Sequence, residues 1–133
     1  MGEKRMGGFV PGGAGDIVFS EEEALELVGG EQDFLVEMVG VLLEQIPECM
    51  EGIRGAVRRG NAEELNSQAH RFKGSVSSLG ARNVAAVCQE LEDMGASGDL
   101  GRSAEALALL EAEVARLRPV YDEFLARATT AQA

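Results

Sequence analysis

The chain has 133 residues, a length that suits one domain with a single hydrophobic core. Residues of the apolar set AVILMFWYC make up 45% of it and aromatic residues 5%, which favours aliphatic packing between helices over an aromatic-rich sheet sandwich. A formal net charge of -11 repels phosphate backbones and anionic lipids alike, so we expect no nucleic-acid partner and no membrane partner.

The N-terminal residues and the cysteines bear on the cellular compartment. Residues 1–16 are rich in glycine and poor in apolar surface, which predicts a flexible tail. They lack the apolar stretch of a secretory signal, and no apolar run is long enough to span a membrane, so we expect a cytoplasmic protein. Cys49 and Cys88 have neither CxxC spacing nor neighbouring histidines, so we expect reduced core residues, no metal site and no cofactor.

Two helices are predicted in the first half of the chain. Ser20 followed by Glu23 forms a capping box, which predicts the start of a short helix that ends at the pair Gly29 and Gly30. From residue 32 to 59, apolar residues recur at steps of four and three, the pattern of a long amphipathic helix. Pro47 lies inside this helix and predicts a kink about one turn earlier.

Three further helices are predicted after Gly60. Asn61 begins a second long helix, which ends at Gly80. A shorter apolar seam covers 84–94, and a last one covers 107–124, interrupted by a proline. Residues 128–133 have nothing to bury and are predicted to be a flexible tail.

The helix connections are short, which favours antiparallel neighbours. We therefore expect an all-α fold over residues 17–127: an antiparallel up-down-up-down four-helix bundle with the short N-terminal helix as a lid. Nothing in the sequence suggests an obligate oligomer, so we expect a monomer.

The single histidine, His70, lies away from the buried seam of its helix. At about 100° per residue it points about 100° from Ala69 and about 200° from Phe72. Its neighbours one turn away include Lys73 and Gly74. Because glycine inside a helix costs roughly 1 kcal/mol relative to alanine, we expect Gly74 to allow the close approach of a partner beside His70.

The surroundings of His70 are locally positive although the chain is acidic. No Asp or Glu occurs from residue 65 to 89, whereas Arg71, Lys73 and Arg82 fall in that window. An anionic group on the imidazole would be stabilised by Lys73, and an acidic partner would be attracted. Ser77, which shares the face of His70, and the cation Arg71 are candidates for partner contact.

Three segments together resemble the signature of histidine phosphotransfer (HPt) domains of multistep two-component signalling. They are Ala69 to Ser75 (AHRFKGS), Leu79 to Ala81 (LGA) and Cys88 to Glu92 (CQELE). With the helix layout, the resemblance extends over residues 18–126. It implies that His70 accepts a phosphoryl group on Nε2 from a receiver-domain aspartate and passes it to another receiver, with no metal of its own.

The resemblance also implies roles for residues around His70. Partner docking in the family uses apolar residues of the lid helix and the start of the first long helix, which here are Leu25, Phe34 and Met38. Phosphorylated kinase domains of the family carry a glutamate at the place of Glu92, where other members carry glutamine. We expect Glu92 to accept a hydrogen bond from Nδ1 of His70 and to orient the ring, although an exposed helix-end carboxylate is an equal alternative.

Two other functions stay open at this point. The chain resembles in the same residues a phosphorylatable domain of a chemotaxis-type histidine kinase, whose donor is an ATP-binding kinase domain. A helical interaction module with an incidental histidine is the second alternative, against which Lys73 and Gly74 speak. No nucleotide-binding motif is present, so we expect a phosphate carrier and not an enzyme.

Overall fold

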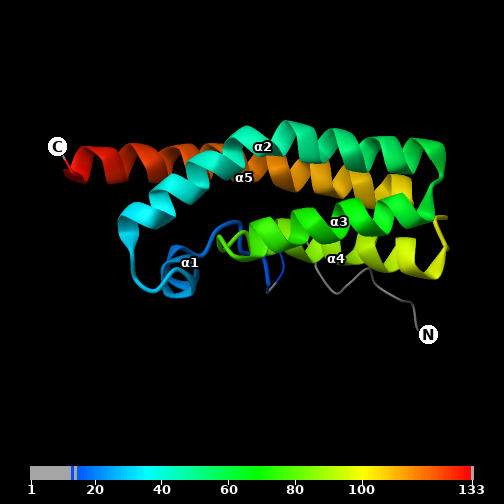
Figure 1. Cartoon of the computed structure of the whole chain (residues 1–133), viewed down its shortest axis with the longest axis horizontal. Coiled ribbons are helices and arrows are strands. Elements are labelled where there is room, and N and C mark those ends of the chain that lie inside the picture. The colour runs from blue at the N-terminus through cyan, green and yellow to red at the C-terminus, as the bar shows by residue number, and fades with distance from the viewer. Residues whose placement is uncertain (1–12, 14, 133) are drawn as a thin grey trace.

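A computed structural model of the chain describes residue 13 and residues 15–132, and within this part all regular structure is helical. The helices are α1 (Glu21–Leu27), α2 (Gln32–Arg59), α3 (Ala62–Ser77), α4 (Arg82–Ser97) and α5 (Ser103–Gln132). Helices α2 to α5 run alternately in opposite directions along the long axis (Figure 1). Each of them packs against two others in the cyclic order α2, α3, α4, α5, which confirms the expected four-helix bundle.

The apolar seams predicted from the sequence form one core. On α3, for example, Leu65, Ala69, Phe72 and Val76 are all buried. Helix α2 runs through Pro47 without a break, and Figure 1 shows it bent partway along its length. The bend agrees with the kink that the lost hydrogen bond at a proline produces.

The two helices that will matter most, α3 and α4, form the closest pair in the bundle. Gly95 of α4 lies against the backbone of α3, where a Cβ atom would stand 2.5 Å from the amide nitrogen of Asn66. Asn66 in turn donates its side-chain amide to the carbonyl oxygen of Glu92 at 2.8 Å. Glycine at position 95 therefore lets the two backbones approach, which fixes the level of Glu92 relative to α3.

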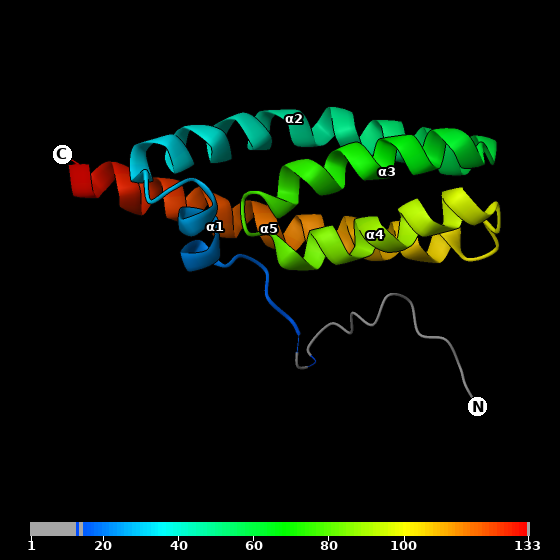
Figure 2. The same cartoon turned by 60° about the horizontal axis from the view of Figure 1, so that its bottom comes forward.

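Helix α1 packs at one end of the bundle, beside the connection between α3 and α4 (Figure 2). The side-chain oxygen of Ser20 accepts from the amide of Glu23, as the capping box predicts. The amide of Ser20 donates to the carbonyl oxygen of Gly80, where a side chain would clash with the backbone of Ser20. The lid is thus attached through backbone contacts that only glycine at position 80 permits.

Residues 1–12 and 14 of the expected N-terminal tail lie outside the described residues. The last residue of that segment, Asp16, pairs with Arg116 of α5 at 3.1 Å and accepts from the side chain of Asn83 at 2.6 Å. Asn83 also donates to the buried carboxylate of Glu113 at 3.0 Å. Ordered contacts with the bundle therefore begin by Asp16.

The last helix is longer than the sequence pattern indicates. Helix α5 passes through Pro119 without interruption and ends at Gln132, beyond the expected limit at residue 127. Leu117 and Tyr121 are buried on either side of the proline, so tertiary packing holds the helix where one backbone hydrogen bond is lost. Ala128 is also buried and continues the seam by one more turn.

Candidate functional site

His70 stands on α3 with its side chain 65% exposed, whereas Ala69 and Phe72 beside it are buried. The exposure follows from helical geometry, because His70 lies outside the arc of apolar residues that faces the core. The ring is therefore open to a macromolecular partner along the side of the bundle.

The orientation of the ring is set by Glu92 of α4. Its Oε2 atom lies 2.9 Å from Nδ1 of His70. An ionised carboxylate only accepts hydrogen bonds, so in the neutral ring Nδ1 carries the proton and the lone pair is on Nε2. The contact expected from the resemblance is present in the structure, and it leaves Nε2 of the neutral ring unprotonated and facing away from Glu92.

The second oxygen of Glu92 is held by a lysine. The ammonium of Lys73 lies 2.7 Å from Oε1 of Glu92 and donates to Oε1 of Gln89 at 2.9 Å. Gln89 then donates to Asp93 at 2.9 Å. The ammonium of Lys73, and after it the bond to His70, hold the pKa of Glu92 below its usual value against the opposing effect of burial. Glu92 is therefore ionised at neutral pH.

Gln89 was not among the residues predicted from the sequence. It precedes Glu92 by three residues, so the two share one face of α4. That spacing would have placed Gln89 near Lys73 once α3 and α4 were paired. We call His70, Lys73, Gln89 and Glu92 the histidine cluster.

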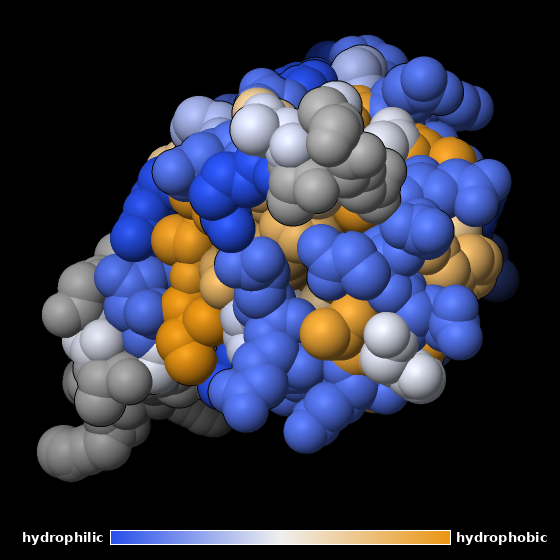
Figure 3. Space-filling view, turned by 90° about the vertical axis from the view of Figure 1, so that its left-hand side faces the viewer, coloured by the Kyte–Doolittle hydropathy of each residue, from blue (hydrophilic) through white to orange (hydrophobic). Residues whose placement is uncertain are grey.

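An apolar hollow adjoins His70, with a volume of about 600 Å³. It lies between α1, the first half of α2 and α3, and Phe34, Met38 and Gly74 line it. A Cβ atom on Gly74 would meet nothing within 4 Å, so the space beside the histidine is open. Viewed from this end of the bundle, apolar patches interrupt the hydrophilic surface (Figure 3).

The residues predicted for partner docking divide into two groups. Phe34, which is 48% exposed, lines the apolar hollow together with Met38 and Arg71. Leu25 is half-buried against the core and does not line the hollow, whereas Leu27, which was not predicted, does so and is 58% exposed. Periodicity does not separate these leucines, because α1 has only seven residues.

Ser77 lies in a different depression, which it shares with Lys73 and Gln89. It is exposed but does not border the apolar hollow. The structure therefore places Ser77 on the α4 side of His70, and Phe34 and Met38 on the α2 side.

The described part of the chain also bears on metal binding and membrane insertion. No group of three or more His, Cys, Asp or Glu side chains there is placed to hold a metal ion. None of the helices in the same residues has the length and apolarity needed to cross a bilayer.

Two solved structures resemble this fold closely. Histidine-containing phosphotransfer protein B (HptB) from Pseudomonas aeruginosa PAO1 matches with a TM-score of 0.76 and 25% identity, covering 83% of this chain and 96% of that one. The HPT domain from the Hpt sensor hybrid histidine kinase from Shewanella matches with a TM-score of 0.75 and 19% identity, covering 83% and 95%. At 19% identity, the similarity to the second structure concerns the fold alone.

Comparison of the sequence itself gives a family. No curated protein matches the chain significantly. The family profile described as Hpt domain matches residues 37–119, a span that is more than half of the chain and includes the whole histidine cluster. The bundle, the exposed histidine and this match agree, and the chain belongs to the Hpt domain family.

Proposed function

We propose that His70 of this Hpt domain is the phosphoryl carrier of a multistep two-component relay. It accepts the group on Nε2 from an aspartyl phosphate of one receiver domain and passes it to an aspartate of another. The observation that carries the proposal is the hydrogen bond of 2.9 Å between Nδ1 of His70 and Glu92 on an otherwise exposed ring.

The chemistry follows from that geometry. The Nε2 lone pair attacks phosphorus, the bond between phosphorus and the aspartate oxygen breaks, and the carboxylate leaves with the bonding electrons. The ring keeps its proton on Nδ1 and becomes positive, and the ionised Glu92 stabilises this charge. Transfer to the next receiver is the reverse reaction, so the same geometry serves both directions.

Lys73 is suited to a second electrostatic role. Its ammonium stands one helical turn from His70 and is half-buried at the edge of the site. Phosphoryl oxygens on Nε2 offer it a further acceptor and a charge-assisted hydrogen bond. The receiver supplies Mg²⁺ and the remaining groups that neutralise the transferring phosphate.

Glu92 is also compatible with a second phosphoryl donor. The resemblance associates a glutamate at this place with domains phosphorylated by the ATP-binding domain of a chemotaxis-type kinase. The reaction at His70 would be unchanged, and only the group leaving phosphorus would be ADP in place of aspartate. Parallel incubations with a phosphorylated receiver, and with ATP and a kinase domain, separate the two donors.

The remaining features fit a passive carrier. We place the protein in the cytoplasm, where its two unpaired cysteines would remain reduced, and treat it as a monomer. It binds no nucleotide and completes no turnover alone, so it acts as a substrate of its partners and not as an enzyme.

His70→Gln is the decisive variant. Glutamine at this exposed position should leave helicity and unfolding unchanged within about 0.5 kcal/mol but should abolish labelling by a phosphorylated receiver. The wild-type phosphate should be acid-labile and alkali-stable, as expected for phosphohistidine. Phosphate retained by His70→Gln would exclude this residue as the carrier.

A further inference from the structure

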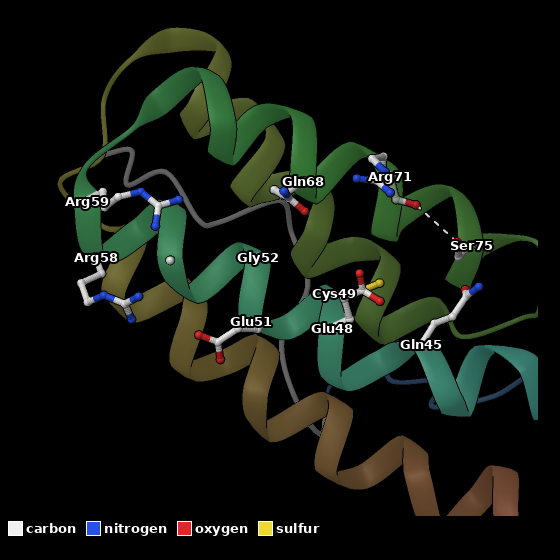
Figure 4. A pocket seen from close by; sticks show the side chains of 11 residues that line it. Gln45, Glu48, Cys49, Glu51, Gly52, Arg58, Arg59, Gln68, Arg71 and Ser75 are labelled. Atoms are coloured by element: carbon white, nitrogen blue, oxygen red, sulfur yellow. Dashed lines mark hydrogen bonds between the residues drawn. The ribbon is translucent and has the colours of Figure 1, made fainter.

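Two cations of α3 lie close to His70 in sequence, and they have different neighbours. The side chain of Arg71 lines a hollow of about 720 Å³ between α2 and α3 (Figure 4). Lys73 instead reaches α4, where its ammonium meets Glu92 and Gln89. Lys73 is therefore the cation whose position depends on side chains of α4.

The ammonium of Lys73 has two neighbouring oxygens on α4, and they hold it differently. It donates a hydrogen bond to Oε1 of Gln89 at 2.9 Å. It also lies 2.7 Å from Oε1 of Glu92, but that oxygen is buried and accepts no hydrogen bond within the described residues, so this contact is ionic. Because a hydrogen bond is directional and an ion pair is not, Gln89 fixes the place of the ammonium.

The amide of Gln89 is itself oriented by Asp93. Its Nε2 atom donates to Oδ1 of Asp93 at 2.9 Å, and the two residues lie four apart on α4. An ionised carboxylate only accepts hydrogen bonds, so it holds the NH2 end of the amide and leaves the amide oxygen facing Lys73. The reverse orientation would bring the NH2 group against the ammonium. Asp93, Gln89 and Lys73 therefore form a chain in which each side chain orients the next.

This chain keeps the ammonium on the side of the ring opposite to Nε2. Glu92 contacts Nδ1 of His70 through one carboxylate oxygen, and the ammonium lies against the other oxygen. Nε2 faces away from this carboxylate, so a phosphoryl group on Nε2 offers the ammonium an anionic partner in another direction. To meet the phosphoryl oxygens, Lys73 must turn away from Gln89.

We propose that Gln89, held by Asp93, is a positioning residue that competes with the phosphoryl group for the ammonium of Lys73 and so sets the lifetime of the phosphohistidine. The inference rests on the proposed function, because it requires a phosphoryl group on His70. In the free chain the ammonium stays with Gln89 and beside Glu92. In the phosphorylated chain it is shared between Gln89 and the phosphoryl oxygens, which shortens the life of the phosphohistidine relative to a chain without this competitor.

Gln89 can be changed without altering the apolar hollow beside His70. It is half-buried in the depression on the α4 side, whose lining also includes Lys73 and Ser77, and it does not line the apolar hollow. The effect of a substitution at Gln89 on Lys73 is therefore separable from an effect on the apolar hollow.

The test measures hydrolysis of the phosphohistidine with no partner protein present. Phosphoramidate labels the chain chemically: Nε2 of His70 attacks phosphorus, the bond between phosphorus and the reagent nitrogen breaks, and ammonia leaves. The reagent is then removed. Water attacks phosphorus, the bond to Nε2 breaks, the ring regains its lone pair, and phosphorus NMR follows the release of inorganic phosphate.

Two substitutions of similar size should change the hydrolysis rate in opposite directions. Gln89→Leu removes the acceptor and leaves the ammonium to the phosphoryl oxygens, so we expect hydrolysis to slow about two-fold. Gln89→Glu offers a charged acceptor that holds the ammonium more firmly, so we expect hydrolysis about three-fold faster at low ionic strength. Asp93→Ala frees the amide to turn and should resemble Gln89→Leu with a smaller change.

The Lys73→Ala background shows whether Gln89 acts through the lysine. With the ammonium absent, Gln89→Leu and Gln89→Glu should both leave the hydrolysis rate unchanged, because the group that they release or hold is gone. Nitrogen NMR of the His70 ring gives a second readout. Since Glu92 is intact, the proton should stay on Nδ1 in each Gln89 variant, whereas a variant that disturbed the packing of α4 would mix the two tautomers.

Ala112→Glu is the matched control for the added charge, because Ala112 is exposed on α5 and lies outside the depression that contains Gln89. It should hydrolyse like the wild type. Equal rates in the wild type, Gln89→Leu and Gln89→Glu would overturn the inference. Shifts of full size in the Lys73→Ala background would overturn it as well.

The outcome for the proposed function is separate. If the expected shifts appear after labelling with phosphoramidate but no receiver exchanges phosphate with the chain, the relay function fails and the role of Gln89 stands. If His70 accepts phosphate neither from phosphoramidate nor from a receiver, both are wrong.

Discussion

Glu90 and Glu92 lie two residues apart on α4, on opposite sides of it, and their surroundings differ. Glu92 contacts Lys73 and His70, and its pKa is held below the usual value. Glu90 is 4% exposed, and neither of its side-chain oxygens has a hydrogen-bond partner within the described residues. Desolvation raises the pKa of Glu90 to about 7, against the opposing influence of Arg102.

The difference shows that two carboxylates on one helix can titrate differently because their neighbours differ. On the side facing α3, a carboxylate remains charged because cationic and hydrogen-bonding groups surround it. On the other side, the same chemical group loses its water, gains no hydrogen bond within the described residues and is protonated more easily. A buried carboxylate with partners does exist in this core: Glu113 accepts from Asn83 and Arg116. Burial alone therefore does not explain the behaviour of Glu90.

The largest effect should come from Glu90→Gln. The pKa of Glu90 rises from an ordinary 4.5 to about 7 on folding, so its stabilising contribution is complete below about pH 4.5 and is lost as the pH rises through 7. One pKa unit corresponds to about 1.4 kcal/mol. We expect Glu90→Gln to raise the free energy of unfolding by about 2 kcal/mol at pH 8. This is less than the pKa difference alone would give, because the side chain of Glu90 can turn toward water when it ionises.

Urea unfolding of wild type and Glu90→Gln at about pH 4.5 and about pH 8 measures this gain. Titration of all other groups cancels in the difference between the two proteins. If the stability difference between the two proteins did not change with pH, the pKa of Glu90 would not be raised by folding. The contrast with Glu92 would then be wrong.

Glu92→Ala should have the next largest effect, and on transfer more than on stability. Without the acceptor on Nδ1, the neutral ring of His70 is free to carry its proton on Nε2, so we expect transfer to slow about ten-fold. Glu92→Gln keeps an acceptor oxygen and should recover most of the rate. Nitrogen NMR of the ring should show a mixture of tautomers in the alanine variant only; an unchanged tautomer and rate would remove the orienting role.

Lys73→Ala should have the smallest effect of the three. The ammonium is at the edge of the site, and we expect transfer to slow about three-fold at low ionic strength, with a smaller difference in salt. Phosphohistidine should hydrolyse faster in this variant, because one cation beside the phosphoryl oxygens is lost. Equal transfer and hydrolysis rates at low salt would mean that Lys73 serves only to hold Glu92.

The sequence predicted the elements that depend on local pattern. The capping box at Ser20, the seam of α3 and the outward position of His70 follow from spacing alone, because a helix repeats every 3.6 residues. The same spacing left Leu25 and Leu27 undecided on a helix of seven residues. It also ended the last helix too early, since the burial of Ala128 depends on what packs beside it.

What only the tertiary structure decided is the pairing of α3 with α4. From the sequence alone, two roles of Glu92 were equally expected: orienting His70, or lying in solvent at the end of the helix. The close approach at Gly95 and the bond from Asn66 set the register that brings Glu92 to Nδ1 and Gln89 to Lys73. Packing on the side of α4 away from α3 removed water from Glu90, two residues away. Whether a carboxylate on α4 is a functional group or a buried one is therefore decided by the helices packed beside it, which no local pattern in the chain encodes.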